Sequence, residues 1–180
     1  MLMRVFGRTG MQLSVLGFGC GAVGGLMVRG DAADQERTIA RALASGVNYF
    51  DTAVLYGDGV SETNLGRVLQ TLKPAGAVIG TKVRVPPGEA SGIADAVTAS
   101  LEGSLARLRL DCVDILHLHN PITEKGGGSA LSVRQVLDDV MPAFERLRQQ
   151  GKIGFLGMTA VGDTAATSRA PRSCGSAIVW

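Results

Sequence analysis

Five short apolar runs recur along the chain at a regular interval, and this recurrence is the feature that most limits its fold. The runs start near residues 15, 47, 77, 112 and 153, so successive starts lie about 30 to 40 residues apart. A helical pattern of apolar residues separates each run from the next. Repeated strand–helix units of this kind predict a parallel sheet of buried strands. Two architectures fit at this point: a doubly wound open sheet and a (βα)₈ barrel.

The segments around these runs carry recognisable turn and cap signals. Residues 4–14 place glycine and threonine between short alternating segments, which predicts a β-hairpin ahead of the first unit. Asp31 or Asp34 can cap the helix that follows the first strand, and Ser61 can cap the next helix. The parallel strands are expected at residues 15–19, 47–50, 77–82, 112–118 and 152–158.

The last stretch departs from the repeat. Residues 165–176 show neither a helical nor a strand period, and Pro171 interrupts them. We therefore expect residues 1–162 to form the βα domain and residues 163–180 to be irregular. Two interpretations of this end stay open: a disordered terminal tail, or a fold that is cut short and followed by an unrelated, non-native tail.

Composition excludes several classes of protein. The net charge is only +2, from 18 basic and 16 acidic residues interspersed along 180 positions, so neither a nucleic-acid partner nor a membrane partner is expected. The first residues lack the apolar core of a signal peptide, and no run approaches the roughly 18 apolar residues of a membrane span. Cys20, Cys112 and Cys174 lack metal-site spacing and are odd in number, which favours a cytoplasmic location without a metal site.

A glycine-rich motif follows the first strand. Gly19 to Gly24 match G-x-G-x-x-G, and Asp51 falls at the end of the next strand, where a ribose-binding acid belongs in a dinucleotide-binding fold. However, the chain continues through Gly30 before any helix cap, so a phosphate would find no helix N-terminus. This alternative, a Rossmann-type dehydrogenase, requires a helix that starts near Gly24.

Polar side chains capable of chemistry follow three successive strands. Asp51 ends the second, Tyr56 lies in the loop after it, Lys82 ends the third and His119 ends the fourth. In a barrel the carboxyl ends of the strands share one face, so these side chains can converge. Each residue alone also has an ordinary interpretation: a turn residue, a loop aromatic, a strand-end lysine with its charge in water and a packed histidine. His117 shares a strand face with His119, but its deeper position favours a packing role.

The four groups together suggest proton donation to a carbonyl. A free tyrosine has a pKa of about 10, and a neighbouring ammonium such as that of Lys82 favours its phenolate form. Asp51 would hold the ammonium in place, and His119 would donate a hydrogen bond to the substrate oxygen, which gains negative charge as hydride arrives. Because no side chain can donate hydride, the reaction needs a nicotinamide cofactor.

The sequence resembles the aldo-keto reductase superfamily from Arg4 to about Gly162. The resemblance implies NAD(P)H-dependent carbonyl reduction on a (βα)₈ barrel, of which this chain would hold about the first five βα units behind an N-terminal hairpin. The long loop after the second strand is similar to that of the bacterial branch and of channel β-subunits. The matching residues are Asp51-Thr52-Ala53, Tyr56-Gly57, Ser61-Glu62, Thr81-Lys82, Asp114 through His119, Pro121 and Gly151-Lys152-Ile153-Gly154.

The resemblance assigns the same four residues that the strand ends suggest. It implies that Tyr56 is the general acid, that Lys82 and Asp51 tune it, and that His119 orients the carbonyl. Tyr56 and His119 would therefore contact the substrate, a small carbonyl compound or alcohol.

The resemblance also predicts the contacts with NADP(H) or NAD(H), for which Gly21, Asp51 and Thr159 are the expected residues. Relatives often carry Ser-Asn after the fifth strand, whereas this chain has Thr159-Ala160, and an alanine side chain forms no hydrogen bond.

A barrel of this type typically needs about 250 residues, so strands six to eight are expected to be missing from this chain. In the family these later segments hold the cofactor's phosphates, which predicts weak NADPH binding or none. The first and fifth strands would be unpaired edges, which predicts self-association. The alternative to an enzyme, or to an inactive fragment of one, is a non-catalytic binding or regulatory protein on the same scaffold, similar to channel β-subunits.

Overall fold

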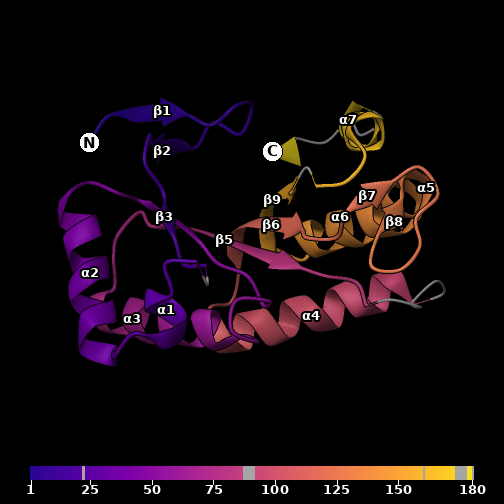
Figure 1. The fold of residues 1–180 in the computed structure, drawn as a ribbon. Helices are drawn as coiled ribbons and strands as arrows, with labels where there is room; N and C mark the ends of the chain where they lie inside the picture. Colours follow the sequence, from indigo (N-terminus) through magenta and orange to yellow (C-terminus); the bar gives the residue numbers. More distant parts are fainter. Residues whose placement is uncertain (22, 87–91, 160, 173–177, 180) are drawn as a thin grey trace. The chain divides into compact units, whose positions relative to one another are not determined.

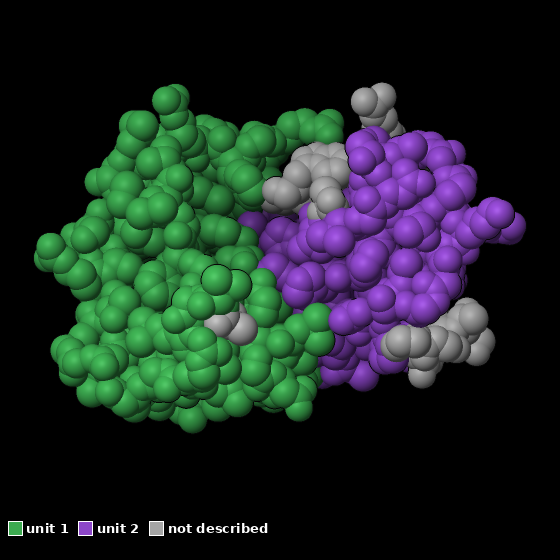
Figure 2. All heavy atoms as spheres, in the orientation of Figure 1, with its two compact units in different colours: residues 1–81, 103–114 green, residues 82–102, 115–180 purple. Residues whose placement is uncertain are grey.

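The computed structural model describes residues 1–21, 23–86, 92–159, 161–172 and 178–179 (Figure 1). The chain forms two compact units, which Figure 2 colours separately. Unit 1 consists of Met1–Thr81 and Gly103–Asp114, and unit 2 consists of Lys82–Glu102 and Ile115–Trp180. Three elements contribute residues to both units: β5 (Val78–Val83), α4 (Ile93–Leu108) and β6 (Val113–Leu118).

Unit 1 begins with the expected antiparallel hairpin. Strand β1 (Met3–Val5) pairs with β2 (Gln12–Ser14). Gly7 and Gly10 in the connecting turn have φ values of 53° and 75°, a conformation that glycine adopts without the steric penalty of a side chain. The hairpin prediction is confirmed.

The first strand of the parallel sheet is shorter than expected. Strand β3 covers Phe18–Gly19 and not residues 15–19, and the side chains of Val15 and Leu16 are 56% and 60% exposed. Local hydrogen bonds explain the difference, because the Ser14 hydroxyl donates to the Leu16 carbonyl at 2.7 Å and the Val15 N–H donates to the Leu2 carbonyl at 3.0 Å. These bonds keep the segment in a turn beside the hairpin.

The parallel strands of unit 1 alternate with helices. Helix α2 (Ala32–Ala44) precedes β4 (Tyr49–Asp51), and α3 (Val60–Leu72) precedes β5. The side chain of Asp31 accepts the Asp34 N–H and caps α2, which decides between the two predicted caps. Strand β4 is parallel to both β3 and β5, and the register brings Asp51 level with Gly19 and Gly80.

The prediction that Ser61 caps α3 is wrong. The residue before the helix is Gly59, whose φ is 85°, and no side chain caps the helix there. The Ser61 side chain turns inward instead: its hydroxyl donates to the Cys20 carbonyl at 2.9 Å and lies 2.9 Å from the Thr52 hydroxyl. Ser61 therefore ties the start of α3 to the segments that follow β3 and β4.

The strand order favours a barrel over a doubly wound sheet. The neighbours in unit 1 are β3-β4-β5, and those in unit 2 are β6, β9 (Ile153–Met158) and β10 (Ile178–Val179), so each set follows chain order. A doubly wound sheet reverses its order at a switch point, and neither set does so. The short helix α1 (Leu26–Arg29) begins near Gly24, where the Rossmann alternative needs a helix, but it spans only four residues.

Unit 2 has an irregular helical connection between β6 and β9. Strands β7 (Ile122–Thr123) and β8 (Leu131–Ser132) lead into α5 (Val133–Gln135), the π-helical turn η1 (Val136–Val140) and α6 (Met141–Gln149). Ser132 and Gln135 form a capping box at the start of α5. Pro142 lies in the first turn of α6 directly after the π-helical turn, where its missing N–H is tolerated.

The prediction of an irregular end is wrong for residues 164–172 and 178–179. These residues form α7 (Thr164–Arg172) and β10, and β10 pairs in parallel with β9, so the fifth strand is not an unpaired edge. The Asp163 carboxylate accepts the Ala165 N–H at 2.9 Å at the start of α7, which contacts α5 and β7. Among the α7 side chains whose burial the structure describes (residues 164–169), Ala166 and Thr167 are buried, and they carry little hydrophobic signal. A domain boundary at residue 162 stays a prediction.

Each unit has its own apolar core. Fully buried side chains of unit 1 include Met27, Ile39, Phe50 and Leu65, and those of unit 2 include Leu101, Leu116, Leu118, Ile122 and Phe144. Within the described ranges, no helix has the length and apolar character needed to span a membrane.

Candidate active site

Asp51 is held at the carboxyl end of β4 by backbone hydrogen bonds. It pairs with Gly19 of β3 and Gly80 of β5, and its carbonyl accepts the Cys20 N–H at 2.8 Å. Its half-buried carboxylate accepts a hydrogen bond from the Tyr49 hydroxyl at 3.3 Å. The predicted carboxylate therefore lies at the edge of the sheet where (βα)₈ enzymes carry their chemistry.

Tyr56 lies in the loop after β4, and its ring is half buried. Its N–H donates to the Ala53 carbonyl at 3.0 Å, which forms a tight turn. A Cβ added to Gly21 would lie 3.7 Å from Cε2 and Cζ of the Tyr56 ring, so Gly21 borders that ring. Unit 1 thus brings Tyr56 and Gly21 together near the ends of β3 and β4, although sequence reasoning assigned them to different functions.

Tyr49 is a residue of this site that sequence reasoning missed. Burial raises the pKa of Tyr49 above its ordinary value, the charge of Asp51 and their hydrogen bond raise it further, and Tyr56 adds a smaller increase. Tyr49 therefore lies close to both predicted catalytic residues of unit 1. The available signal was its position two residues before Asp51, which puts both side chains on one face of the strand.

Unit 2 contains the other two predicted catalytic residues. Lys82 lies in β5 and is only 5% exposed, which argues against a strand-end lysine whose charge reaches water. His119 follows β6, is half buried, and donates its N–H to the Val83 carbonyl at 2.8 Å. Within unit 2, the ends of β5 and β6 therefore carry Lys82 and His119 on adjoining segments.

The four residues are thus divided between the units, with Asp51 and Tyr56 in unit 1 and Lys82 and His119 in unit 2. The convergence of the two pairs into one site stays a prediction.

His117 has the packing position expected for it. It is 7% exposed, and a Cβ added to Gly157 of β9 would collide with its imidazole ring, so a glycine is needed there. Asn120 was not singled out by sequence, yet it is 1% exposed and its amide bonds to both the N–H and the carbonyl of Val85 and to the Ser129 carbonyl, at 2.8 to 2.9 Å. Asn120 therefore fixes the loop that begins at His119.

Thr159 directly follows β9 and is half buried. Its N–H and its hydroxyl both point to the Leu118 carbonyl, at 3.0 and 3.3 Å. Because the hydroxyl donates its proton to Leu118, its oxygen keeps lone pairs that can accept a hydrogen bond. Ala160, the second residue of the predicted cofactor contact, lies outside the described residues.

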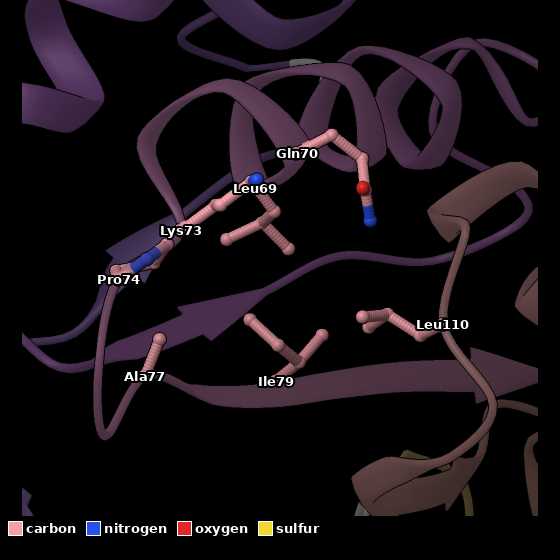
Figure 3. A pocket seen from close by; sticks show the side chains of 7 residues that line it. All are labelled: Leu69, Gln70, Lys73, Pro74, Ala77, Ile79 and Leu110. Carbon is pink, nitrogen blue, oxygen red and sulfur yellow. The ribbon is translucent and has the colours of Figure 1, made fainter.

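A pocket of about 310 Å³ in unit 1 lies away from these residues (Figure 3). The side chains of Leu69, Ile79 and Leu110 point into it from α3, from β5 and from the segment before β6. Ala77 and Ile79 mark the amino-terminal end of β5, whereas Asp51 lies at the carboxyl end of the parallel strand β4. The pocket is therefore separate from the Asp51 and Tyr56 site.

Known proteins resemble this chain in both sequence and fold. L-galactose dehydrogenase from Arabidopsis thaliana is 34% identical over 161 residues, which cover 88% of this chain and 48% of that protein. An aldo-keto reductase from Bacillus halodurans, solved in its holo form, superposes with a TM-score of 0.70 at 28% identity. The superposed part covers 88% of this chain and 50% of the reductase. An aldo/keto reductase from Klebsiella pneumoniae, solved in complex with NADP and acetate, has a TM-score of 0.67 at 26% identity, with 91% and 51% covered.

These likenesses establish the fold class and its extent. The fold is α/β and of the TIM-type (βα)₈ barrel, and the chain spans about half the length of the relatives it matches. The model of the Aldo/keto reductase family matches residues 15–176, which is most of the sequence. The chain therefore belongs to the aldo/keto reductase family.

Proposed function

We propose that this chain acts as an NAD(P)H-dependent oxidoreductase that reduces a small aldehyde or ketone to an alcohol, or catalyses the reverse reaction. The family match and the dehydrogenase names of relatives support an oxidoreductase. The observation that carries the proposal is the position of Asp51 and of Tyr56, with Gly21 beside its ring, at the carboxyl ends of parallel strands. A cytoplasmic location and self-association belong to the same proposal.

In this proposal each of four side chains has a separate task. The Tyr56 hydroxyl gives its proton to the substrate oxygen, and Lys82 and Asp51 adjust its acidity, because a nearby ammonium favours the phenolate. His119 donates a hydrogen bond that orients the carbonyl and stabilises the charge growing on its oxygen. The nicotinamide supplies the hydride that no side chain can provide.

One feature of each unit supports a nicotinamide cofactor in this proposal. The Thr159 oxygen can accept a hydrogen bond from a carboxamide NH₂, because its own proton goes to Leu118. Among the described residues, a Cβ added to Gly19 would meet nothing within 4 Å, so open space borders the strand end beside Asp51. The complex of the Klebsiella pneumoniae relative with NADP supports NADP(H) as the cofactor, with NAD(H) as the other choice.

Replacement of Tyr56 by phenylalanine tests this function. Turnover of a generic aldehyde such as 4-nitrobenzaldehyde is followed by the loss of NADPH absorbance, with NADPH at millimolar concentration to offset weak binding. Removal of the general acid should lower kcat about 10² to 10⁴-fold. Thr63→Val, which removes an exposed hydroxyl on α3, is the matched control and should keep wild-type turnover.

Two results would count against the proposal. Equal rates for the wild type and Tyr56→Phe would remove Tyr56 from the chemistry. No turnover by the wild type at millimolar NADPH would favour an inactive fragment of an enzyme, or a non-catalytic binding or regulatory protein on the same scaffold.

A further inference from the structure

The side chain of Tyr49 fills a space between two glycines of neighbouring segments in unit 1. A Cβ added to Gly17, just before β3, would lie 2.9 Å from the Tyr49 Cδ1 atom. A Cβ added to Gly80 of β5 would lie 2.6 Å from the Tyr49 hydroxyl oxygen and 3.2 Å from its Cζ atom. All three distances are shorter than van der Waals contact, so the Tyr49 side chain needs glycine on each side.

The two glycines contact different parts of the tyrosine. Gly17 faces the base of the ring and Gly80 faces the hydroxyl, so the side chain leans along β4 toward its carboxyl end. Tyr49 pairs with Val78 in β5, yet its hydroxyl reaches the level of Gly80, which pairs with Asp51. This lean brings the hydroxyl to the carboxylate of Asp51.

The Tyr49 hydroxyl donates to Oδ1 of Asp51 at 3.3 Å. This distance is longer than that of a strong O–H···O bond, so the hydrogen bond is a weak one. Burial raises the pKa of Tyr49, as does the neighbouring Asp51 charge, so the hydroxyl keeps its proton and remains a donor at neutral pH.

We propose that Tyr49 is a positioning residue whose hydroxyl orients the Asp51 carboxylate, and that Gly80 and Gly17 serve to leave room for it. The inference rests on the proposed part of Asp51 in proton donation. It adds a residue that touches no substrate and acts through Asp51. It also explains why two neighbouring segments carry glycine on either side of one aromatic ring.

The first test observes the Asp51 carboxyl group directly. Protein labelled with ¹³C at the aspartate carboxyl carbon gives a resonance that the spectrum of Asp51→Asn assigns. Tyr49→Phe keeps the ring and removes the hydroxyl, so the Asp51 resonance should shift at neutral pH. Gly80→Ala should shift the same resonance, because its Cβ displaces the hydroxyl. An Asp51 resonance in Tyr49→Phe that coincides with the wild-type resonance overturns the inference.

The second test is a double-mutant cycle on stability, measured as the midpoint of urea denaturation by circular dichroism. Gly80→Ala should lower the stability less in the Tyr49→Phe background than in the wild type. The reason is that phenylalanine lacks the hydroxyl oxygen that the added Cβ would meet. Gly17→Ala is the matched control: its Cβ strikes the ring, so its loss should be the same in both backgrounds. Equal losses from Gly80→Ala in both backgrounds contradict the proposal.

The third test separates positioning from a purely structural role. Tyr49→Phe should lower kcat for aldehyde reduction by up to about tenfold with KM unchanged, which is at most the scale of one ordinary lost hydrogen bond. An unchanged kcat beside a shifted Asp51 resonance refutes the positioning role. Absence of wild-type turnover contradicts the proposed function alone, because the resonance and the mutant cycle still decide whether Tyr49 holds Asp51.

Discussion

Single residues set the polar chemistry at the carboxyl end of β4. Tyr49 is buried against two glycines and donates to Asp51, while Tyr56 stands beside Gly21. The chain contains two tyrosines, and both belong to this region of unit 1. Burial and the Asp51 charge raise the pKa of Tyr49 and hold its hydroxyl in the protonated form. This raised pKa has a consequence for stability at alkaline pH.

Tyr49 should make the folded chain sensitive to alkali. In the unfolded chain Tyr49 ionises near its ordinary pKa of about 10, whereas in the folded chain its pKa is raised and the hydroxyl stays protonated at that pH. The stabilisation of the folded state by Tyr49 is therefore fully present below pH 10 and is lost as the pH rises through the folded pKa. Above pH 10, the free energy of unfolding of the wild type should fall faster than that of Tyr49→Phe, by up to about 1.4 kcal/mol per pH unit.

Urea denaturation at a series of pH values, followed by circular dichroism, measures this difference. Asp51 and Tyr56 are the charged or titratable groups that perturb Tyr49, and both remain in the variant. Parallel pH profiles for the two proteins would contradict the prediction.

Helices α3 and α4 are joined in unit 1 by an ion pair between a buried carboxylate and a half-buried guanidinium group. Glu62 near the start of α3 is fully buried, and its Oε2 accepts from Nε of Arg107 in the last turn of α4 at 2.7 Å. Its other oxygen accepts the hydroxyl proton of Thr81 in β5. A Cβ on Gly66 would lie 2.5 Å from the Arg107 carbonyl, so the two helices also touch through their backbones. Glu62 therefore links two helices and a strand.

Removal of the Arg107 charge should destabilise the chain strongly. Arg107→Leu leaves the Glu62 carboxylate buried with the Thr81 hydroxyl but without its cation. Loss of one partner of a fully buried pair typically costs about 3 to 5 kcal/mol, which is the upper bound for this pair because Arg107 is half buried. The double variant Glu62→Leu with Arg107→Leu should recover most of that loss, because apolar groups then replace both charges. Urea denaturation measures both values.

An exposed pair in α6 provides the matched control. Arg148 bonds to Glu145 on the surface, and removal of its charge by Arg148→Leu should change the stability little. A similar loss from Arg107→Leu and Arg148→Leu would show that burial does not decide the strength of the Glu62 pair.

At the scale of the whole molecule, the chain spans about half the length of its relatives. Among the described residues, β3 pairs only with β4 in the parallel sheet, whereas β9 pairs with both β6 and the short strand β10. The four predicted catalytic residues, Asp51, Tyr56, Lys82 and His119, all lie within this half. The segments that would hold the cofactor's phosphates are expected, from the family resemblance, to lie beyond it.

The isolated chain should therefore bind NADPH weakly or not at all. A titration that follows NADPH fluorescence measures the affinity, and the Klebsiella pneumoniae relative that was solved with NADP provides the positive control. Low-micromolar binding by the 180-residue chain would contradict this expectation.

The sequence by itself determined the succession of strands and helices and the polar residues at the strand ends. The spacing of apolar residues is a local property of the sequence, so it can be read without knowing the fold. This spacing marks the buried strands, and Asp51, Lys82 and His119 then fall at their carboxyl ends. Only the tertiary structure decided that Ser61 bonds to Cys20 rather than capping a helix, that Glu62 meets Arg107, and that weakly apolar residues form α7. These outcomes depend on contacts between residues far apart in the chain, and no local pattern encodes which distant group a side chain will meet.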